Sequence, residues 1–210
     1  MSVNPELAQG VIKVGDGRGF IIEAKENRLV VTAAHCLPSF PPPAASVGYD
    51  ERTYQNLLGM IDGEPSVWCE LLFADPVADI AVLGAPDGQA LYDQHDAYLA
   101  LTNDRPTLRV ADPPGEFTDA WLLSLDGDWQ ACKVRHVGDD HPTASATPLW
   151  IEQASKGIHG GMSGSPIIAD GAAISVVCVS GGGLETMHTE GGPNPRLMHH
   201  LPGWLLASAK

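Results

Sequence analysis

The chain of 210 residues has few basic residues and no long apolar run. No apolar segment approaches the roughly 18 residues that a membrane span needs. Only 12 Lys and Arg stand against 26 Asp and Glu, which gives a formal net charge of −14. Because such a surface repels phosphate backbones and anionic lipids, we expect no nucleic acid and no membrane as partners.

Paired cysteine motifs are also missing. The four cysteines, Cys36, Cys69, Cys132 and Cys178, form no CxxC pair, so a zinc or redox cluster has no support. Two of them lie in apolar stretches, where a free thiol behaves as a small hydrophobic side chain. The first residues, MSVNPELAQG, have neither the basic start nor the apolar stretch of a secretory signal. Together these features predict a cytoplasmic protein with reduced thiols.

Glycine and proline, by contrast, are abundant, with 23 Gly and 17 Pro. That density favours many short strands joined by turns. Residues 10–34 predict three strands, GVIKVG, GFIIEA and RLVVTAA, separated by tight polar turns. Further strands are expected at residues 66–73 and 80–83, whereas FPPPAAS at residues 40–46 predicts a surface loop.

The second half of the chain repeats this character. Residues 102–116, TNDRPTLRVADPPGE, predict a crossing between two halves, and AWLLSL, WQACKVRHV, PLWIEQ, PIIA and AAISVVCVS are predicted strands. The last stretch, HHLPGWLLASAK, is the best helix candidate. We expect an all-β chain in two similar halves, residues 1–105 and 106–210, which ends in an α-helix.

Three short strings carry candidate chemistry, and the first is VVTAAHC at residues 30–36. A predicted strand leads into small residues that allow a tight turn, and His35 follows them. An imidazole has a reference pKa near 6.5, so it can accept and return a proton near neutral pH. This string alone leaves open that His35 is a structural histidine at a strand end.

The second string is ADPVADIAVL at residues 74–83. Asp79 opens an apolar strand, where an unpaired buried carboxylate would be costly. A carboxylate that orients a catalytic imidazole fits that position, although a simple strand-start cap fits it too. Asp75 precedes a proline and predicts a turn residue.

The third string is GIHGGMSGSP at residues 157–166. Glycines on both sides of Ser163 allow a strained turn that exposes its hydroxyl. The same turn can aim the backbone N–H groups of Gly161 and Ser163 at one point, as an oxyanion site requires. A flexible Gly/Ser loop is the alternative, and Ser165 lies past the turn and is expected to point toward the next strand.

Taken together, VTAAHC, DIAVL and GMSGSP resemble the three signatures of trypsin/chymotrypsin-like serine proteases, in the order His, Asp, Ser. The spacings of 44 residues from His35 to Asp79 and 84 residues from there to Ser163 are similar to those of the family. ADPVADIAVL and GSP look nearer to bacterial relatives such as the HtrA or glutamyl endopeptidase branches. The resemblance covers nearly the whole chain from residue 10.

The resemblance implies two packed Greek-key barrels of about six strands each, with the site between them. His35 and Asp79 would come from the first barrel, and Ser163 with the oxyanion site from the second. The expected activity is that of a serine endopeptidase that acts through an acyl-enzyme, with a protein or peptide as substrate. No metal and no organic cofactor is required.

For the substrate specificity, the resemblance implies only which residues of this chain line the primary pocket. One edge of the primary pocket should be formed by Ser180, Gly181 and Gly182, with its floor near Gly157 and Ile158. No Asp stands at that floor, so a preference for Lys or Arg is not expected, and an apolar side chain is the simplest ligand. Charged or histidine side chains from nearby remain alternatives, namely Glu185, Glu190, His159 and His188.

The chain departs from the family at two places. Met162 stands where secreted relatives carry an Asp that pairs with a newly cut N-terminus, so that activation switch is absent. The oxyanion site is then either permanently formed or organised by a ligand or a regulatory protein partner. Cys36 is retained, but its usual disulfide partner is expected near Gly19 and Phe20, where no Cys stands.

Two other functions remain to be weighed against the endopeptidase. A non-catalytic module could keep the fold and hold a peptide, but the chain retains all three triad residue types. A metal protein built on His199 and His200 has no HExxH or cysteine spacing in its favour. For the endopeptidase we expect a restricted target, such as that of an effector in a bacterial stress or defence pathway.

Overall fold

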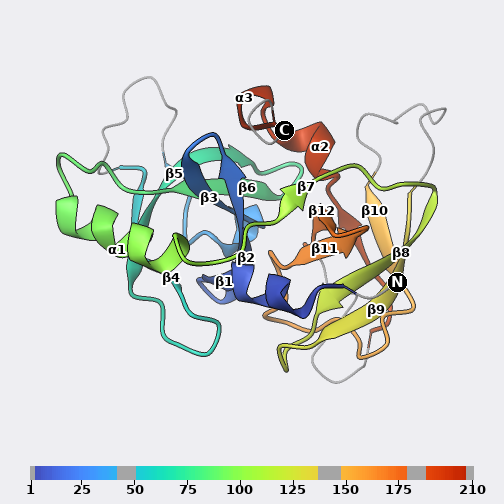
Figure 1. Cartoon of the computed structure of the whole chain (residues 1–210). Coiled ribbons are helices and arrows are strands. Elements are labelled where there is room, and N and C mark those ends of the chain that lie inside the picture. The colour runs from blue at the N-terminus through green and yellow to red at the C-terminus, as the bar shows by residue number, and fades with distance from the viewer. Residues whose placement is uncertain (1–2, 42–50, 137–147, 179–187, 207–210) are drawn as a thin grey trace.

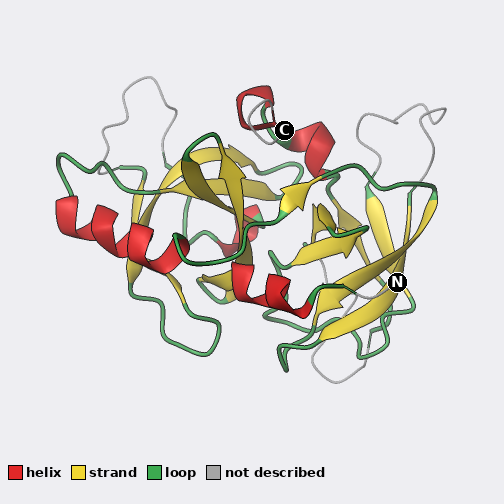
Figure 2. Ribbon diagram, viewed as in Figure 1, coloured by secondary structure: helices red, strands yellow, loops and turns green. Residues whose placement is uncertain are grey.

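The computed structural model describes residues 3–41, 51–136, 148–178 and 188–206. Strands dominate it, and they gather into two halves that lie side by side (Figures 1 and 2). The prediction of a mostly β chain in two halves is confirmed.

The first half is a closed barrel with the strand order β1-β2-β3-β6-β5-β4. All its pairs are antiparallel, and its strands are β1 (Val11–Val14), β2 (Gly17–Ala24), β3 (Asn27–Thr32), β4 (Thr53–Gly59), β5 (Val67–Asp75) and β6 (Ile80–Gly84). The 3-10 helix η1 (Pro5–Gly10) precedes the barrel.

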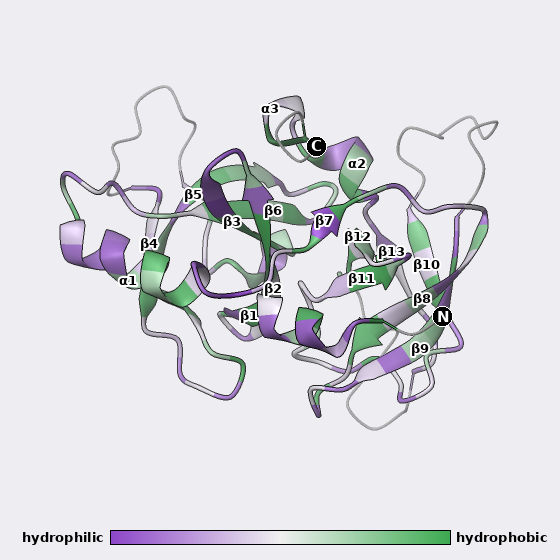
Figure 3. Ribbon diagram, in the orientation of Figure 1, coloured by the Kyte–Doolittle hydropathy of each residue, from purple (hydrophilic) through white to green (hydrophobic). Residues whose placement is uncertain are grey.

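Successive side chains of β2 point to opposite faces, and both faces are buried. Ile21 belongs to the core inside the first barrel, whereas Phe20 and Ile22 belong to a cluster shared with residues of the second half. Burial on both sides therefore explains the consecutive apolar residues Phe20, Ile21 and Ile22. Figure 3 shows that hydrophobic residues gather on the strands of both halves.

The second half is a seven-stranded sheet with the order β13-β10-β9-β8-β11-β12-β7. Its strands are β7 (Arg109–Val110), β8 (Phe117–Leu123), β9 (Trp129–Arg135), β10 (Leu149–Glu152), β11 (Pro166–Ala169), β12 (Ala172–Val176) and β13 (Gly191–Asn194). The short β7 pairs with β12 in parallel. Within the described residues no pairing of β13 with β7 closes the sheet, so it is a curled sheet where a six-stranded barrel was expected.

The helices differ from the sequence prediction. An unpredicted helix, α1 (Tyr92–Thr102), packs against β5, and its buried Tyr98 donates a hydrogen bond of 2.9 Å to the carbonyl of Arg28. In place of one C-terminal helix there are two single turns, α2 (Leu197–His200) and α3 (Gly203–Leu206). Pro202 lies between them and has no N–H with which to continue a helix. In the described parts of the chain, no helix has the length and apolarity to cross a membrane.

The expected boundary between residues 105 and 106 falls between α1 and β7. Every strand of the closed barrel lies before it and every strand of the curled sheet lies after it. Whether the two parts are separate folding units stays a prediction.

Candidate active site

His35 lies in the short 3-10 helix η2 (Ala34–Cys36), which follows directly on β3. Ala33 and Ala34 before it are buried and small, so the chain can turn tightly at the end of the strand. The imidazole itself is 47% exposed. The end of the strand thus places the imidazole of His35 at the surface.

Asp79 stands immediately before β6, the strand that pairs with β3. Its backbone has a φ of 59°, in the left-handed region that non-glycine residues rarely adopt. Its Oδ2 lies 2.7 Å from His35 Nδ1, and its Oδ1 accepts a hydrogen bond of 2.9 Å from the backbone N–H of His35. The carboxylate therefore fixes both the ring and the backbone of the histidine.

The two groups shift each other's pKa toward the ionised pair. The hydrogen bond that the His35 ring donates to Asp79 raises the pKa of His35, although burial opposes the shift. Burial alone would raise the pKa of Asp79, but hydrogen bonds from the side chain and backbone of His35 outweigh it and lower that pKa. An ionised carboxylate at Nδ1 accepts a hydrogen bond from the ring N–H there, which leaves Nε2 of the neutral ring free to accept a proton.

Asp75, the other acidic residue of the string, is the turn residue that the sequence predicts. Its Oδ1 accepts hydrogen bonds of 3.0 Å from the N–H groups of Val77 and Ala78.

Ser163 lies in a turn between two glycines with positive φ, Gly161 at +87° and Gly164 at +80°. Its carbonyl accepts a hydrogen bond of 2.7 Å from the backbone N–H of Arg18 in β2. A Cβ on Gly164 would lie 1.8 Å from the carbonyl oxygen of Arg18, so only glycine allows this approach.

The structure brings Ser163 and His35 to one cavity of about 310 Å³, although it records no hydrogen bond between their side chains. Catalytic hydrogen bonds are often long in structures without substrate. Among the described residues, no acceptor is recorded for the backbone N–H groups of Gly161 and Ser163, so both are available to an oxyanion. Ser165, in contrast, is fully buried, as its predicted direction requires.

The same cavity is lined by the apolar side chains of Leu37 and Leu57, and by Cys36 beside Gly17. A Cβ on Gly17 would lie 2.6 Å from the Cys36 sulfur. Gly17, and not the expected region around Gly19 and Phe20, therefore faces this thiol, and the sequence prediction of the facing position was wrong.

All four cysteines are free thiols. Burial raises the pKa of Cys36 to about 11 and that of Cys132 to about 12, so both stay protonated at neutral pH.

The predicted specificity residues are only partly described. Ser180, Gly181, Gly182 and Glu185 lie outside the described residues. Ile158 is 1% exposed, belongs to the core of the second half, and donates its N–H to the carbonyl of His188 at 2.7 Å.

Gly157 is buried and Glu190 is exposed. The ring of His159 donates to the carbonyl of Lys156 at 3.0 Å. None of these contacts involves a substrate, so the pocket floor at Gly157 and Ile158 stays a prediction.

His199 and His200, which the sequence offers as metal ligands, each lie near a carboxylate. His199 lies 3.6 Å from Asp112, and His200 lies 3.5 Å from Asp75, so adjacent residues pair with different carboxylates. No group of three or more His, Cys, Asp or Glu suited to a metal ion occurs in the described part of the chain.

The sequence did not indicate two buried polar residues, of which Arg18 binds the Ser163 carbonyl and Gln130 binds the segment before the turn. Arg18 is 4% exposed, although it carries a charge, and Gln130 is 2% exposed. Their only sequence signal is a polar residue within a predicted strand, at DGRGF and WQACKV.

No sequence-family model and no curated protein sequence matches the chain. Solved structures match it over nearly its full length. The NS6 protease from murine norovirus 1 is 15% identical, with 93% of this chain and 94% of that one covered and a TM-score of 0.54. The serine protease domain of the Sesbania mosaic virus polyprotein is 11% identical, with 92% of each chain covered and a TM-score of 0.53.

A bacterial structure matches as well. An inactive form of Rv3671c from M. tuberculosis H37Rv is 18% identical, with 100% of this chain and 95% of that one covered and a TM-score of 0.50. At these identities the likeness establishes the fold alone. The chain has the chymotrypsin-like fold of viral and bacterial serine proteases, as the sequence predicts.

Proposed function

We propose that the chain is a serine endopeptidase with Ser163 as nucleophile, His35 as general base and acid, and Asp79 as the residue that orients His35. The observation that carries the proposal is the His35 ring, bonded to Asp79 at 2.7 Å, in the cavity that it shares with Ser163. The fold, shared with the serine protease domain of the Sesbania mosaic virus polyprotein, supports the same function.

In the first step, Nε2 of neutral His35 takes the hydroxyl proton of Ser163 while the oxygen attacks the peptide carbonyl carbon. The carbonyl oxygen becomes an oxyanion and accepts hydrogen bonds from the N–H groups of Gly161 and Ser163. Asp79 stays ionised and stabilises the imidazolium. The imidazolium then gives its proton to the leaving amine, the C–N bond breaks, and an ester on Ser163 remains.

In the second step, water replaces the amine. His35 takes a proton from the water, and the hydroxide attacks the ester carbonyl to form a second oxyanion at the same N–H groups. The proton returns to the Ser163 oxygen as the C–O bond breaks, which releases the acid and restores the enzyme. The protein groups named here complete the cycle.

For the substrate, we propose an extended protein segment with an apolar side chain in the primary pocket, because no Asp stands at Gly157 or Ile158 to bind Lys or Arg. The acidic surface disfavours nucleic acid and anionic membrane as partners.

For the cellular role, we propose a restricted target in the cytoplasm, as in a bacterial stress or defence effector, with a regulatory protein as a further partner. The likeness to the HtrA and glutamyl endopeptidase branches rests on the sequence strings alone.

The test is cleavage of a diverse peptide library, mapped by mass spectrometry. Wild type should cut a subset of peptides, and Ser163→Ala should cut none of them. Ser165→Ala is the matched control, because its hydroxyl is buried without a hydrogen-bond partner, and it should retain the wild-type pattern. A Ser163→Ala protein that still cuts the same bonds would contradict the proposal.

The second candidate is a peptide-binding module without catalysis. The absence of a recorded hydrogen bond between the described side chains of Ser163 and His35 is the observation that favours it. A folded wild type that cuts nothing but binds library peptides would support this function in place of the first.

A further inference from the structure

The turn that carries Ser163 lacks the ion pair that secreted relatives use to organise their oxyanion site. Met162 occupies the position of the Asp, is fully buried, and lies in the apolar core of the second half with Ile158. Its sulfur accepts only a weak contact of 3.3 Å from the N–H of His159. The side chain of Met162 therefore supplies no ion pair to the segment that leads into the turn.

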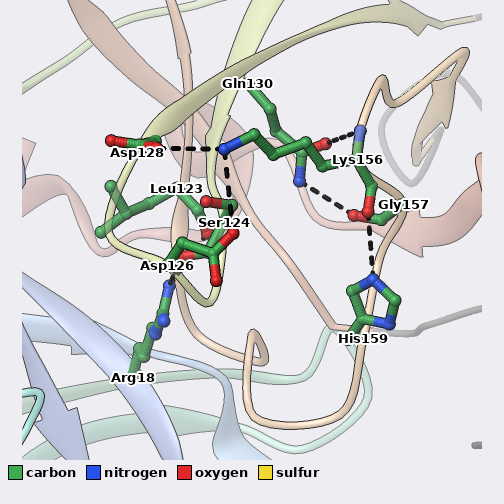
Figure 4. A network of polar contacts seen from close by, with 9 residues as sticks. All are labelled: Arg18, Leu123, Ser124, Asp126, Asp128, Gln130, Lys156, Gly157 and His159. Carbon is green, nitrogen blue, oxygen red and sulfur yellow. Dashed lines mark hydrogen bonds and ion pairs between the residues drawn. The ribbon is translucent and has the colours of Figure 1, made fainter.

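Gln130 of β9 reaches that segment with both ends of its amide. Its Oε1 accepts a hydrogen bond of 2.7 Å from the backbone N–H of Lys156, and its Nε2 donates one of 2.9 Å to the carbonyl of Gly157. Figure 4 shows the amide between these two backbone groups. Because the bond to Gly157 is buried, its loss would leave a buried backbone carbonyl without that partner, whereas the bond to Lys156 is partly exposed.

The hairpin between β8 and β9 extends this contact toward the oxyanion site. Lys156 Nζ lies 3.1 Å from Asp128 and 3.8 Å from Asp126, both on the hairpin (Figure 4). These pairs are exposed, so they add little by themselves. A Cβ on Gly161 would lie 3.7 Å from Leu125, so the hairpin also flanks the glycine whose N–H faces the oxyanion.

Arg18 connects the hairpin to the first barrel. Its Nη1 donates hydrogen bonds of 2.9 Å to the carbonyl of Leu123 and 3.0 Å to that of Ser124, and its backbone N–H binds the carbonyl of Ser163. Burial lowers the pKa of the guanidinium, but the group is satisfied by these carbonyls. The hairpin, the β2 strand and the Ser163 turn are thus joined by one arginine.

We propose that Gln130 is a positioning residue that keeps the segment from Lys156 to Ser163 in the form that aligns the oxyanion N–H groups, in place of the missing ion pair. The inference rests on the proposed function. It implies that the oxyanion site needs no ion pair with a newly cut N-terminus, because Gln130 makes both bonds of its amide to the segment itself.

The test uses the full chain and two readouts. Gln130→Met keeps the shape of the side chain and removes both hydrogen bonds. We expect its rate of Ser163 labelling by a small fluorophosphonate to fall about tenfold or more at every pH, with the pH midpoint unchanged, because His35 and Asp79 are untouched. Hydrogen exchange at the N–H of Lys156 should accelerate in the same variant.

Two further variants separate positioning from general stability. Thr118→Val removes a buried hydrogen bond of 3.0 Å to the carbonyl of Gly115 elsewhere on β8, and should label at the wild-type rate. Gln130→Glu keeps the acceptor for Lys156 but not the donor for Gly157, so Lys156 should stay protected while labelling slows. If Gln130→Met does not fold, the labelling rate and hydrogen exchange of Gln130→Glu test the inference in its place.

Wild-type labelling in Gln130→Met, or an equal loss in Thr118→Val, would overturn the inference alone. A wild type that is not labelled at all would overturn the proposed function, and the inference with it.

Discussion

The two halves of the molecule hold their parts of the candidate site in different ways. In the first barrel, His35 and Asp79 stand at the ends of two paired strands and bind each other directly through two hydrogen bonds. In the second half, Ser163 lies in a turn between two glycines that have left-handed backbone conformations. Neighbouring residues hold this turn through backbone hydrogen bonds. The acid–base pair is therefore sensitive to side-chain chemistry, and the nucleophile is sensitive to backbone shape.

The largest effect should come from the side-chain pair. Asp79→Asn should lower kcat by about 10⁴-fold, because an amide favours the wrong tautomer of His35. Asp75→Asn is the matched control, since its turn contacts accept from backbone N–H groups, which Asn can also satisfy. Steady-state kinetics on a library-derived peptide measures both variants. A loss below tenfold in Asp79→Asn would contradict the assigned role.

Backbone shape is tested in the second half by two glycines of the same turn. Gly164→Ala should lower the free energy of unfolding by about 3 kcal/mol or more, because its Cβ would clash with the Arg18 carbonyl at a φ of +80°. At Gly160 a Cβ would meet nothing within 4 Å, so Gly160→Ala should change stability by only about 0.5 kcal/mol. Chemical denaturation measures both. Equal costs would show that the turn can relax.

The dependence of kcat/KM on pH should report the ionisation of His35 in the first barrel. His35 must be neutral to accept the Ser163 proton, so kcat/KM should rise with pH through the pKa of His35. The hydrogen bond that His35 donates to Asp79 raises that pKa, which places the midpoint above the ordinary value of 6.5. The residual activity of Asp79→Asn should have a lower midpoint. An unchanged midpoint in Asp79→Asn would show that Asp79 does not raise the pKa of His35.

The smallest effect tests a contact within the first half, between β2 and the segment that follows β3. Gly17→Cys should form a disulfide with Cys36 under mild oxidation, because a Cβ at that position lies against the sulfur. Gly19→Cys should not, since its Cβ would face Val14 and Val30 instead. Intact-mass measurement before and after reduction distinguishes them. A disulfide in Gly19→Cys alone would contradict the described register.

The hairpins from β1 to β3 could be predicted from the sequence because they depend on local patterns. The three motifs around His35, Asp79 and Ser163 could be recognised for the same reason. The sequence prediction missed β4, where Asn56 at a φ of 53° interrupts the strand pattern, and β13, whose GGPN reads as a turn. It also missed α1, whose buried residues Tyr98 and Thr102 leave little apolar periodicity.

Long-range contacts could not be predicted from the sequence for a different reason. That Gly17 faces Cys36, and that Gln130 reaches Lys156, depends on strand register and on hairpin placement. Neither leaves a periodic signal in the chain. The candidate residues His35, Asp79 and Ser163 could be named in advance, but the groups that hold them in place could not.

The most direct test is covalent labelling of the native protein with a fluorophosphonate, followed by peptide mapping of the adduct. The account predicts a single adduct on the Ser163 oxygen in wild type, and its loss in His35→Ala, where no base activates the hydroxyl. An adduct on another residue, or an unreactive folded wild type, would contradict it.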